Sequence, residues 1–237
     1  MQLQNTLNNI NISEAFISFQ GEGKYIGARQ LFIRFSGCDV NCQGCDTDYS
    51  SKESFIFFDK IYYNPVNIFQ FVEDIKGYDI FNEIHSISFT GGEPLLSLEA
   101  IKFMISSFGK KTKYFLETSG YHLDTLKEIY DLLDIVSIDI KLKSTFGVDD
   151  NIYALKNAYF IEKNKSYFKL IVDNKIEQFE IANVVDLLKS KGFDEIYLHT
   201  KNNLVEFKLL SDIMKIFYGS GINCFFVPQM HKLVGIR

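Results

Sequence analysis

Residues 31–47, LFIRFSGCDVNCQGCDT, join a strand pattern to a group of cysteines. Residues 31–35 are apolar apart from one arginine, which is typical of a strand inside a sheet. Cys38, Cys42 and Cys45 then follow within eight positions, although the whole chain holds only four cysteines. In a reducing compartment such a group binds a metal or takes part in redox chemistry more often than it forms disulfides. The stretch therefore predicts a strand whose end presents thiols.

The strand pattern recurs along the chain and alternates with helical patterns. Further strands are predicted at 86–90, 114–118, 134–140, 167–172, 195–199 and 223–227. Helices are predicted where apolar residues recur every three to four positions, at 68–75, 97–108, 126–133, 177–191 and 203–218. This alternation is typical of a parallel sheet with helices outside it, so we predict an α/β fold in one domain, residues 1–237. Residues 51–64 fit the repeat poorly and are predicted to form an excursion or a short hairpin.

Polar residues follow five of the predicted strands at the point where each strand ends. The segments are the cysteine loop, GGEP at 91–94, ETSG at 117–120, Asp139 with Lys141, and PQMHK at 228–232. In parallel sheets and barrels the carboxyl ends of the strands meet at one edge, and active sites are built there. We therefore predict an enzyme with its site at this edge.

Composition excludes several other classes of protein. Of the 237 residues, 46% are hydrophobic and 23% are charged, so the chain can bury a large core. The net charge of −5 predicts no general attraction to nucleic acid or to an anionic membrane, and the expected partner is a small molecule. The sequence shows no targeting pattern and no apolar run of about 18 residues. We expect a soluble, cytoplasmic protein that binds neither nucleic acid nor membrane.

The spacing C-x3-C-x2-C differs from that of common zinc sites, in which two C-x2-C pairs supply four ligands. Thiolates also hold iron-sulfur clusters, and the usual four-iron cubane takes one cysteine per iron. Three cysteines leave one iron open to another ligand. The alternatives are a structural zinc site completed by Cys224 or a histidine, and a non-catalytic iron-sulfur protein. Cys224, inside the apolar run NCFFV, is expected to be a buried core residue.

The cysteine spacing on a loop after the first strand, together with GGEP, resembles the radical S-adenosylmethionine (SAM) superfamily. The resemblance implies a partial, open parallel β/α barrel with about six core strands. It implies that Cys38, Cys42 and Cys45 hold a 4Fe-4S cluster whose open iron binds SAM and whose electron cleaves SAM to a 5'-deoxyadenosyl radical. The residues that it assigns to SAM are Gly44, Cys45, Asp46, Gly92, Glu93, Glu117, Ser119, Asp139 and Lys141, with Glu93 accepting from the SAM amino group.

Residues 16–47, FISFQGEGKYIGARQLFIRFSGCDVNCQGCDT, are more specific, because they resemble the 7-carboxy-7-deazaguanine synthase family. The similarity resumes at FTGGEPLL, LETSG and VPQMHK. It implies a carbon-nitrogen lyase that converts 6-carboxy-5,6,7,8-tetrahydropterin to 7-carboxy-7-deazaguanine with loss of ammonia, on the route to queuosine. The residues implied in substrate binding are Phe19, Gln20, Gly21, Glu22, Arg34, Thr90, Gln229 and His231, with Arg34 on the substrate carboxylate.

The family resemblance also implies Mg2+ held by Thr47 together with substrate oxygens, which suits a hard cation. A flavodoxin-like or ferredoxin-like reductant and a homodimer are implied as well. Two departures from the family pattern limit the comparison. LKSTFG around Lys143 replaces the family's usual turn, which leaves later SAM contacts unassigned, and LVGIR continues beyond Lys232, so no contact of a terminal carboxylate is carried over.

Another radical SAM protein shares the cysteine spacing and the GGE turn. It is an activase that forms a glycyl radical on a partner enzyme. Such an activase has no reason to carry QGEG at 20–23 together with Thr47. The combination therefore favours the synthase, and the activase is the alternative.

Overall fold

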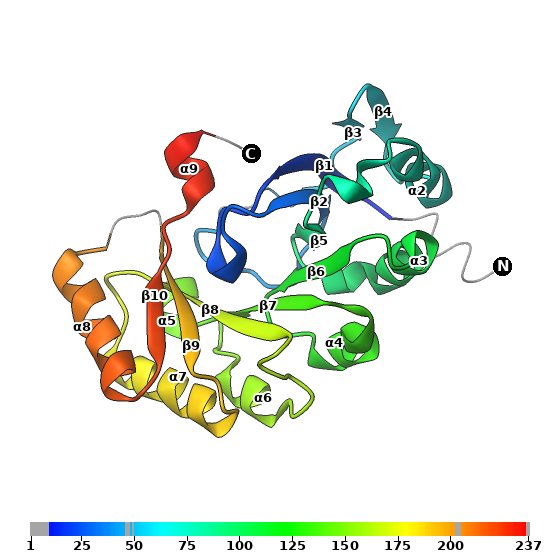
Figure 1. Cartoon of the computed structure of the whole chain (residues 1–237). Coiled ribbons are helices and arrows are strands. Elements are labelled where there is room, and N and C mark those ends of the chain that lie inside the picture. Colours follow the sequence, from blue (N-terminus) through cyan, green and yellow to red (C-terminus); the bar gives the residue numbers. More distant parts are fainter. Residues whose placement is uncertain (1–9, 46–47, 49, 202–204, 236–237) are drawn as a thin grey trace.

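The structure, a computed structural model, describes residues 10–45, 48, 50–201 and 205–235. Its centre is an eight-stranded sheet with the strand order β1-β2-β5-β6-β7-β8-β9-β10 (Figure 1). β1 is antiparallel to β2, and every other pair of neighbours is parallel. Because β1 and β10 are edge strands, the sheet is open and does not close into a barrel. This architecture confirms the predicted α/β fold with an open, mostly parallel sheet.

The described residues form the following elements. The strands of the large sheet are β1 (Ile12–Phe19), β2 (Arg29–Phe35), β5 (Ser86–Gly91), β6 (Lys113–Thr118), β7 (Ile135–Ile140), β8 (Ser166–Val172), β9 (Glu195–Thr200) and β10 (Asn223–Phe226). The α-helices are α2 (Ile68–Gly77), α3 (Leu98–Phe108), α4 (Leu123–Ile129), α5 (Lys143–Phe146), α6 (Ile152–Asn157), α7 (Gln178–Ser190), α8 (Phe207–Gly219) and α9 (Met230–Val234). Short 3-10 helices are η1 (Gly23–Tyr25), η2 (Ile80–Asn82), η3 (Pro94–Ser97) and η4 (Tyr130–Leu132). None of the helices within these ranges is long and apolar enough to cross a membrane.

Every strand predicted from the sequence is present. Six of them, from β2 to β9 in sheet order, are the inner strands of the sheet, and the seventh, β10, is parallel to β9 at the edge. Residues 51–64 contain the predicted hairpin, made of β3 (Ser54–Phe57) and β4 (Lys60–Tyr63). The sequence patterns missed β1, α5, α6 and α9. β1 is an edge strand whose burial is irregular, and α5 and α6 have only four and six residues, too few to show a helical repeat.

Alternate side chains of the strands face opposite sides of the sheet. On β8, Phe168, Leu170 and Val172 belong to the main core, which the helices cover. Figure 1 shows α3, α4, α6, α7 and α8 along this outer side of the curved sheet. Helix α3 contributes Ile101 and Met104, which are fully buried at the helical spacing predicted for them. Burial of each such side chain contributes about 1.5–3 kcal/mol, so this layer supplies most of the stability of the fold.

The remaining positions of the strands face the inner side. Phe115, Ile135, Tyr167 and Tyr197, in the first halves of their strands, form a separate apolar cluster with Val227, which follows β10. Two positions further along β6, β8 and β9, the same face carries Glu117, Lys169 and His199. The inner side is therefore closed by aromatic rings at one end and is polar at the carboxyl ends of the strands.

The GGE turn after β5 packs against the end of β2. The Gly92 amide donates to the Phe35 carbonyl oxygen at 3.1 Å, and the Glu93 amide donates to Gly37 at 3.0 Å. Gly91 has a φ of +118°, and a Cβ added there would lie 2.3 Å from the Phe35 carbonyl oxygen. Only glycine allows this approach, so Gly91 fixes the position of the turn relative to the cysteine loop.

We expect Gly91→Ala to lower the free energy of unfolding by about 2–4 kcal/mol, because the new methyl group meets backbone that is held in the β2–β5 ladder. Gly192→Ala is the matched control. Gly192 also has a positive φ, of +70°, in the turn that ends α7, but no atom lies within 4 Å of its added Cβ. The control should cost about 1 kcal/mol, from backbone strain alone. Urea denaturation of the protein without added cofactors measures both, and equal losses would show that the close approach is unimportant.

Candidate active site

The carboxyl ends of the strands enclose a cavity of about 430 Å³. It is lined by most of the residues singled out from the sequence, namely Phe19, Gln20, Gly21, Glu22, Arg34, Cys38, Cys42, Gly44, Cys45, Thr90, Gly92, Glu117, Ser119, Asp139, Lys141 and Gln229. Asp46, Thr47 and the side chain of His231 lie outside the described part of the chain, so their roles stay predictions. Segments that are far apart in the sequence are thus brought to one place, as the strand-end argument predicted.

The cysteine loop follows β2 and is held from the opposite side of the cavity. The backbone N–H of Gln43 donates to the carbonyl oxygen of Phe146 in α5 at 2.8 Å. The Lys201 ammonium donates to the carbonyl oxygens of Gln43 at 2.7 Å and Thr145 at 2.6 Å. Burial raises the pKa of the Cys38 thiol above its ordinary value. The loop is therefore tied to α5 and β9, neither of which was linked to it by sequence patterns.

The donor set on this loop fits an iron-sulfur cluster better than a single ion. Among the described residues, no three His, Cys, Asp or Glu side chains converge closely enough to hold one metal ion. A four-iron cluster takes its cysteine ligands on different irons, and Cys38, Cys42 and Cys45 all border one cavity. Cys224 lies on β10 in the main core, where burial raises its pKa to about 12. The structure confirms that Cys224 is a core residue and not a member of this group.

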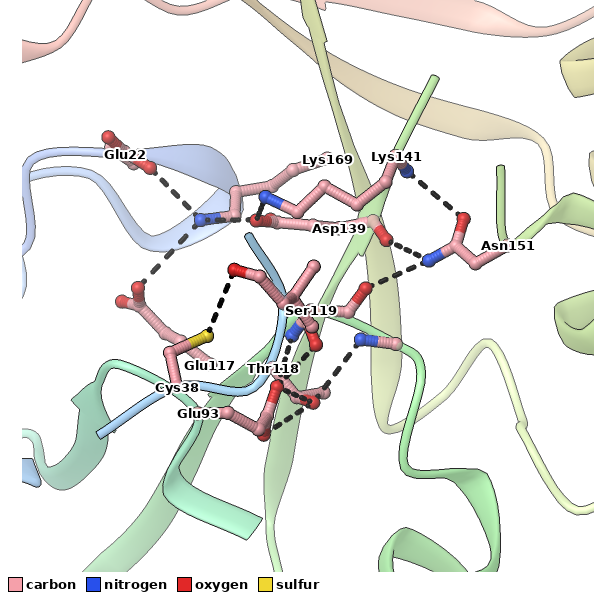
Figure 2. Close-up of polar contacts among 12 residues, drawn as sticks. Glu22, Cys38, Glu93, Glu117, Thr118, Ser119, Asp139, Lys141, Asn151 and Lys169 are labelled. Carbon is pink, nitrogen blue, oxygen red and sulfur yellow. Dashed lines mark hydrogen bonds and ion pairs between the residues drawn. The ribbon is translucent and has the colours of Figure 1, made fainter. Parts of the chain in front are cut away.

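Glu93 lies beneath the cavity and is fully buried. Its carboxylate accepts hydrogen bonds from the Thr118 hydroxyl at 3.0 Å, the Ser119 amide at 2.9 Å and the Leu95 amide at 3.2 Å, and also from the Ser119 hydroxyl. These bonds join the turn after β5 to the end of β6 (Figure 2). The predicted contact of Glu93 with the amino group of SAM would have to replace at least one of them.

Asn151, which precedes α6, is a site residue that sequence reasoning missed. Its amide nitrogen donates to the backbone carbonyls of Ser119 at 2.8 Å and Asp139 at 2.9 Å, and its oxygen accepts from the Lys141 amide at 3.0 Å (Figure 2). A buried asparagine that satisfies three backbone groups fixes the ends of β6 and β7 relative to each other. No local sequence signal distinguishes it from an ordinary asparagine at a helix start.

Lys169 is the second missed residue, and it lies at the centre of the polar side of the cavity. Its ammonium is 3.0 Å from a carboxylate oxygen of Glu22, 3.3 Å from Asp139 and 3.8 Å from Glu117 (Figure 2). Asp139 also pairs with Lys141 at 2.9 Å. The sequence did hold a signal, because a lysine within the apolar run YFKLIV is unusual in a buried strand.

Burial and pairing act in opposite directions on these charges. Burial alone would raise the pKa of Glu22, but the ammonium of Lys169 and the amide of Gln229 hold it well below its usual range. The pKa of Asp139 is likewise lowered, because Lys141 and Lys169 outweigh its burial. Burial would lower the pKa of Lys169, but the three carboxylates raise it well above its usual range. Glu22, Asp139 and Lys169 are therefore charged at neutral pH.

The loop that carries Glu22 is fixed from several sides. Gln20 is buried, and its amide nitrogen donates to Glu117 at 2.6 Å and to Gln30 at 3.1 Å. The side-chain amide nitrogen of Gln229 donates to the Glu22 carboxylate at 2.7 Å. The backbone N–H of Met230 donates to the Gly21 carbonyl oxygen at 3.0 Å. The structure thus places α9 against this loop, as the similarity of VPQMHK suggested.

Gly23 connects the same loop to β8 and β9. Its amide donates to Nε2 of His199 at 3.2 Å, and burial lowers the pKa of His199, which favours the neutral ring that can accept this bond. A Cβ on Gly23 would lie 2.6 Å from the Tyr167 ring. His199 was not predicted from the sequence, because its position depends on a contact 176 residues away.

Arg34, near the end of β2, also lines the cavity. Its guanidinium lies 5.3 Å from the centre of the Phe16 ring and 3.9 Å from a Glu14 carboxylate oxygen. Its Nε has no hydrogen-bond partner within the described residues. A guanidinium that is stacked but loosely paired is suited to bind an anion that enters the cavity.

The fold and the thiol-lined cavity define an iron-sulfur enzyme of the radical SAM type. The family model described as "4Fe-4S single cluster domain" matches residues 19–156. A 7-carboxy-7-deazaguanine synthase of Archaeoglobus fulgidus is 30% identical over 96% of this chain and 99% of the relative. Another from Methanothermobacter thermautotrophicus is 39% identical over 76% of this chain and 64% of the relative. The chain therefore belongs to the 7-carboxy-7-deazaguanine synthase family.

A solved structure supports the fold assignment. The crystal structure of QueE from Escherichia coli superposes with a TM-score of 0.56, covering 95% of this chain and 98% of that one at 18% sequence identity. At this identity the likeness concerns the fold, and it agrees with the predicted radical SAM architecture.

The lowered pKa of Glu22 predicts a pH-dependent contribution to stability. Because the folded-state pKa lies below the unfolded value of about 4.3, the stabilisation is present above that pH and is lost as the pH falls. We expect Glu22→Gln to lower the free energy of unfolding at pH 7 by about 1–3 kcal/mol, with a gap from wild type that narrows below about pH 4.5.

Urea denaturation between pH 7 and pH 3.5 measures this gap. Glu73→Gln is the control, because Glu73 is 65% exposed in a surface pair with Lys76 and should matter little at any pH. A gap for Glu22→Gln that stayed constant across the range would mean that the carboxylate charge is not what stabilises the loop.

Proposed function

We propose that this protein is a 7-carboxy-7-deazaguanine synthase that converts 6-carboxy-5,6,7,8-tetrahydropterin to 7-carboxy-7-deazaguanine with loss of ammonia, a carbon-nitrogen lyase of queuosine biosynthesis. One observation carries the proposal. A single cavity is lined both by Cys38, Cys42 and Cys45 and by the charged side chains of Glu22 and Arg34. Membership of the synthase family supports the same conclusion.

The cysteine side of the cavity is proposed to hold a 4Fe-4S cluster and SAM. When bound, the cluster and SAM supply the one-electron chemistry that removes a hydrogen atom from the substrate. The three thiolates hold the cluster, and the open strand ends offer polar groups to SAM from Gly44, Cys45, Asp46, Gly92, Glu93, Glu117, Ser119, Asp139 and Lys141. Asn151 keeps two of these strand ends in register, so it supports the site without touching a ligand.

The part of the cavity that Glu22 and Arg34 line is proposed to bind the pterin. The carboxylate of Glu22 accepts from the amidine-like N–H groups of the ring, and Arg34 pairs with the substrate carboxylate. Phe19, Gln20, Gly21, Thr90, Gln229 and His231 complete this side. Gln20 and Gln229 both bond to the acidic groups around them, so they orient Glu22 and Glu117 as well as bordering the ligand.

Further components of the proposal rest on the family resemblance. Mg2+ would be held by Thr47 and substrate oxygens, which suits an ion that prefers hard oxygen ligands. The electron would come from a flavodoxin-like or ferredoxin-like protein. The active form would be a homodimer of single-domain chains.

The cluster ligands are tested by anaerobic reconstitution. We expect wild-type protein and Cys224→Ala to bind about four irons and four sulfides per chain, because Cys224 lies in the core. Cys42→Ala should lose most of this iron. Chemical assays measure the iron and sulfide content of each protein. The ligand assignment would be wrong if Cys42→Ala kept its full iron content or if Cys224→Ala lost its iron.

The reaction is tested with the carboxylated pterin, SAM, Mg2+ and a reductant, and mass spectrometry should detect 7-carboxy-7-deazaguanine. Turnover should fall when Mg2+ is omitted. Arg34→Ala should raise the pterin requirement roughly ten- to a hundredfold and leave the SAM requirement nearly unchanged, because it removes one charge-assisted pair to a carboxylate.

Arg29→Ala is the control for this variant. Arg29 lies at the start of the same strand and pairs with Glu83 on the surface, so its loss should change neither requirement. Abundant 5'-deoxyadenosine without a deazaguanine product, together with stimulation by a large protein partner, would instead favour the glycyl-radical activase.

A further inference from the structure

Lys169 is one of the most deeply buried cations of the described chain, with 4% of its surface exposed. It sits opposite Asp139 in the β7–β8 ladder, and both side chains point to the inner side of the sheet. Glu117 reaches it from β6 and Glu22 from the loop after β1 (Figure 2). Four segments therefore meet at one ammonium group.

The three carboxylates do not depend on Lys169 alone. Glu22 also accepts from Gln229, Glu117 from Gln20, and Asp139 from Lys141. These second partners come from three different segments of the chain, namely the segment before α9, the loop after β1 and the end of β7. The shared ammonium is what keeps them together, since three buried negative charges would otherwise repel one another.

Lys169 interacts with all three carboxylates. Its ammonium donates a hydrogen bond to Glu22 at 3.0 Å and forms ion pairs with Asp139 at 3.3 Å and with Glu117 at 3.8 Å. Lys169 and the three carboxylates all line the cavity. A ligand there would meet carboxylates whose positions depend on the one ammonium group that they share, as is expected of a residue that orients others.

We propose that Lys169 is a positioning residue that serves both ligand sites at once. It fixes Glu22 for the pterin and fixes Asp139 and Glu117 for SAM. This inference rests on the proposed function, because it takes from that function which ligand each carboxylate meets. Its consequence is that one substitution weakens the binding of two chemically unrelated ligands, whereas Arg34 affects the pterin alone.

The test compares Lys169→Met, which keeps length and removes charge, with Lys169→Arg, which keeps charge. The dissociation constants of SAM and of the carboxylated pterin are measured separately by equilibrium dialysis with reconstituted protein, after iron content is checked. Lys169→Met should weaken both ligands about tenfold or more. Lys169→Arg should recover part of both losses, because the charge is retained.

Lys165→Met is the matched control. Lys165 precedes β8, is half-buried and donates to the Tyr130 carbonyl oxygen, far from the cavity lining. It should leave both dissociation constants unchanged. A loss of affinity in Lys169→Met for only one ligand, or for neither, would overturn the two-site role.

Combination with Glu22→Gln separates positioning from a general disturbance of the fold. If Lys169 acts on the pterin through Glu22, the two substitutions together should weaken pterin binding little more than either alone. For SAM, adding Glu22→Gln to Lys169→Met should change nothing. Full additivity for the pterin would contradict action through Glu22.

If Lys169→Met does not fold, the double variant Lys169→Met/Glu117→Gln is tested in its place. It removes one positive and one negative charge together, so the net charge of the buried group is unchanged. This variant should fold and still bind the pterin at least about tenfold more weakly than Glu117→Gln alone. Pterin binding equal to that of Glu117→Gln would overturn the proposal.

Ligand binding by the wild-type protein shows whether a negative result contradicts the proposed function or only the role of Lys169. Binding of SAM without binding of the carboxylated pterin would remove the proposed function and with it the two-site role. The SAM affinities of wild type and Lys169→Met would still decide whether Lys169 orients Asp139 and Glu117. Binding of both ligands equally by wild type and Lys169→Met would overturn only the role of Lys169.

Discussion

The alternation of side chains along parallel strands is the constraint on which the rest of this structure depends. Each strand sends one set of residues to the helices and the other set to the inner side of an open sheet. On β8 the first set is apolar, while the second passes from Tyr167 to Lys169 within two positions. Because every parallel strand ends at the same edge, the polar ends gather there. A shift of register by one residue in β8 would turn Lys169 into the core and Leu170 into the cavity.

The buried charged side chains at the polar edge of the sheet depend on one another. A buried ammonium or carboxylate alone would lose its charge or destabilise the fold. Glu22, Asp139 and Lys169 instead hold one another charged, and the side-chain amides of Gln20 and Gln229 donate to Glu117 and Glu22. Other protein groups thus fix the charged side chains of the cavity, which lowers the cost of ordering them when a ligand binds.

Much of this arrangement could be predicted from the sequence. The residues that could not be predicted were missed for a common physical reason. Cys38, Cys42, Cys45 and the GGE turn are recognisable because their spacing is local. The strands and long helices are recognisable because burial is periodic. Lys169, His199 and Asn151 depend instead on partners distant in the sequence, and a single side chain carries no record of its partner. β1 was missed because an edge strand buries its residues irregularly.

The pairing of Gln229 with Glu22 joins positions 207 residues apart, and that of Lys169 with Glu22 joins positions 147 apart. Contacts of such long range close large loops, and their entropic cost is recovered only after most of the sheet has formed. The ligand-facing loop after β1 therefore takes its final shape late, when β8 and α9 are already in place. Opening of the same loop would break its bonds to β8, β9 and the segment before α9 together, so the shape of the ligand-facing loop is coupled to the half of the sheet farthest from it in the sequence.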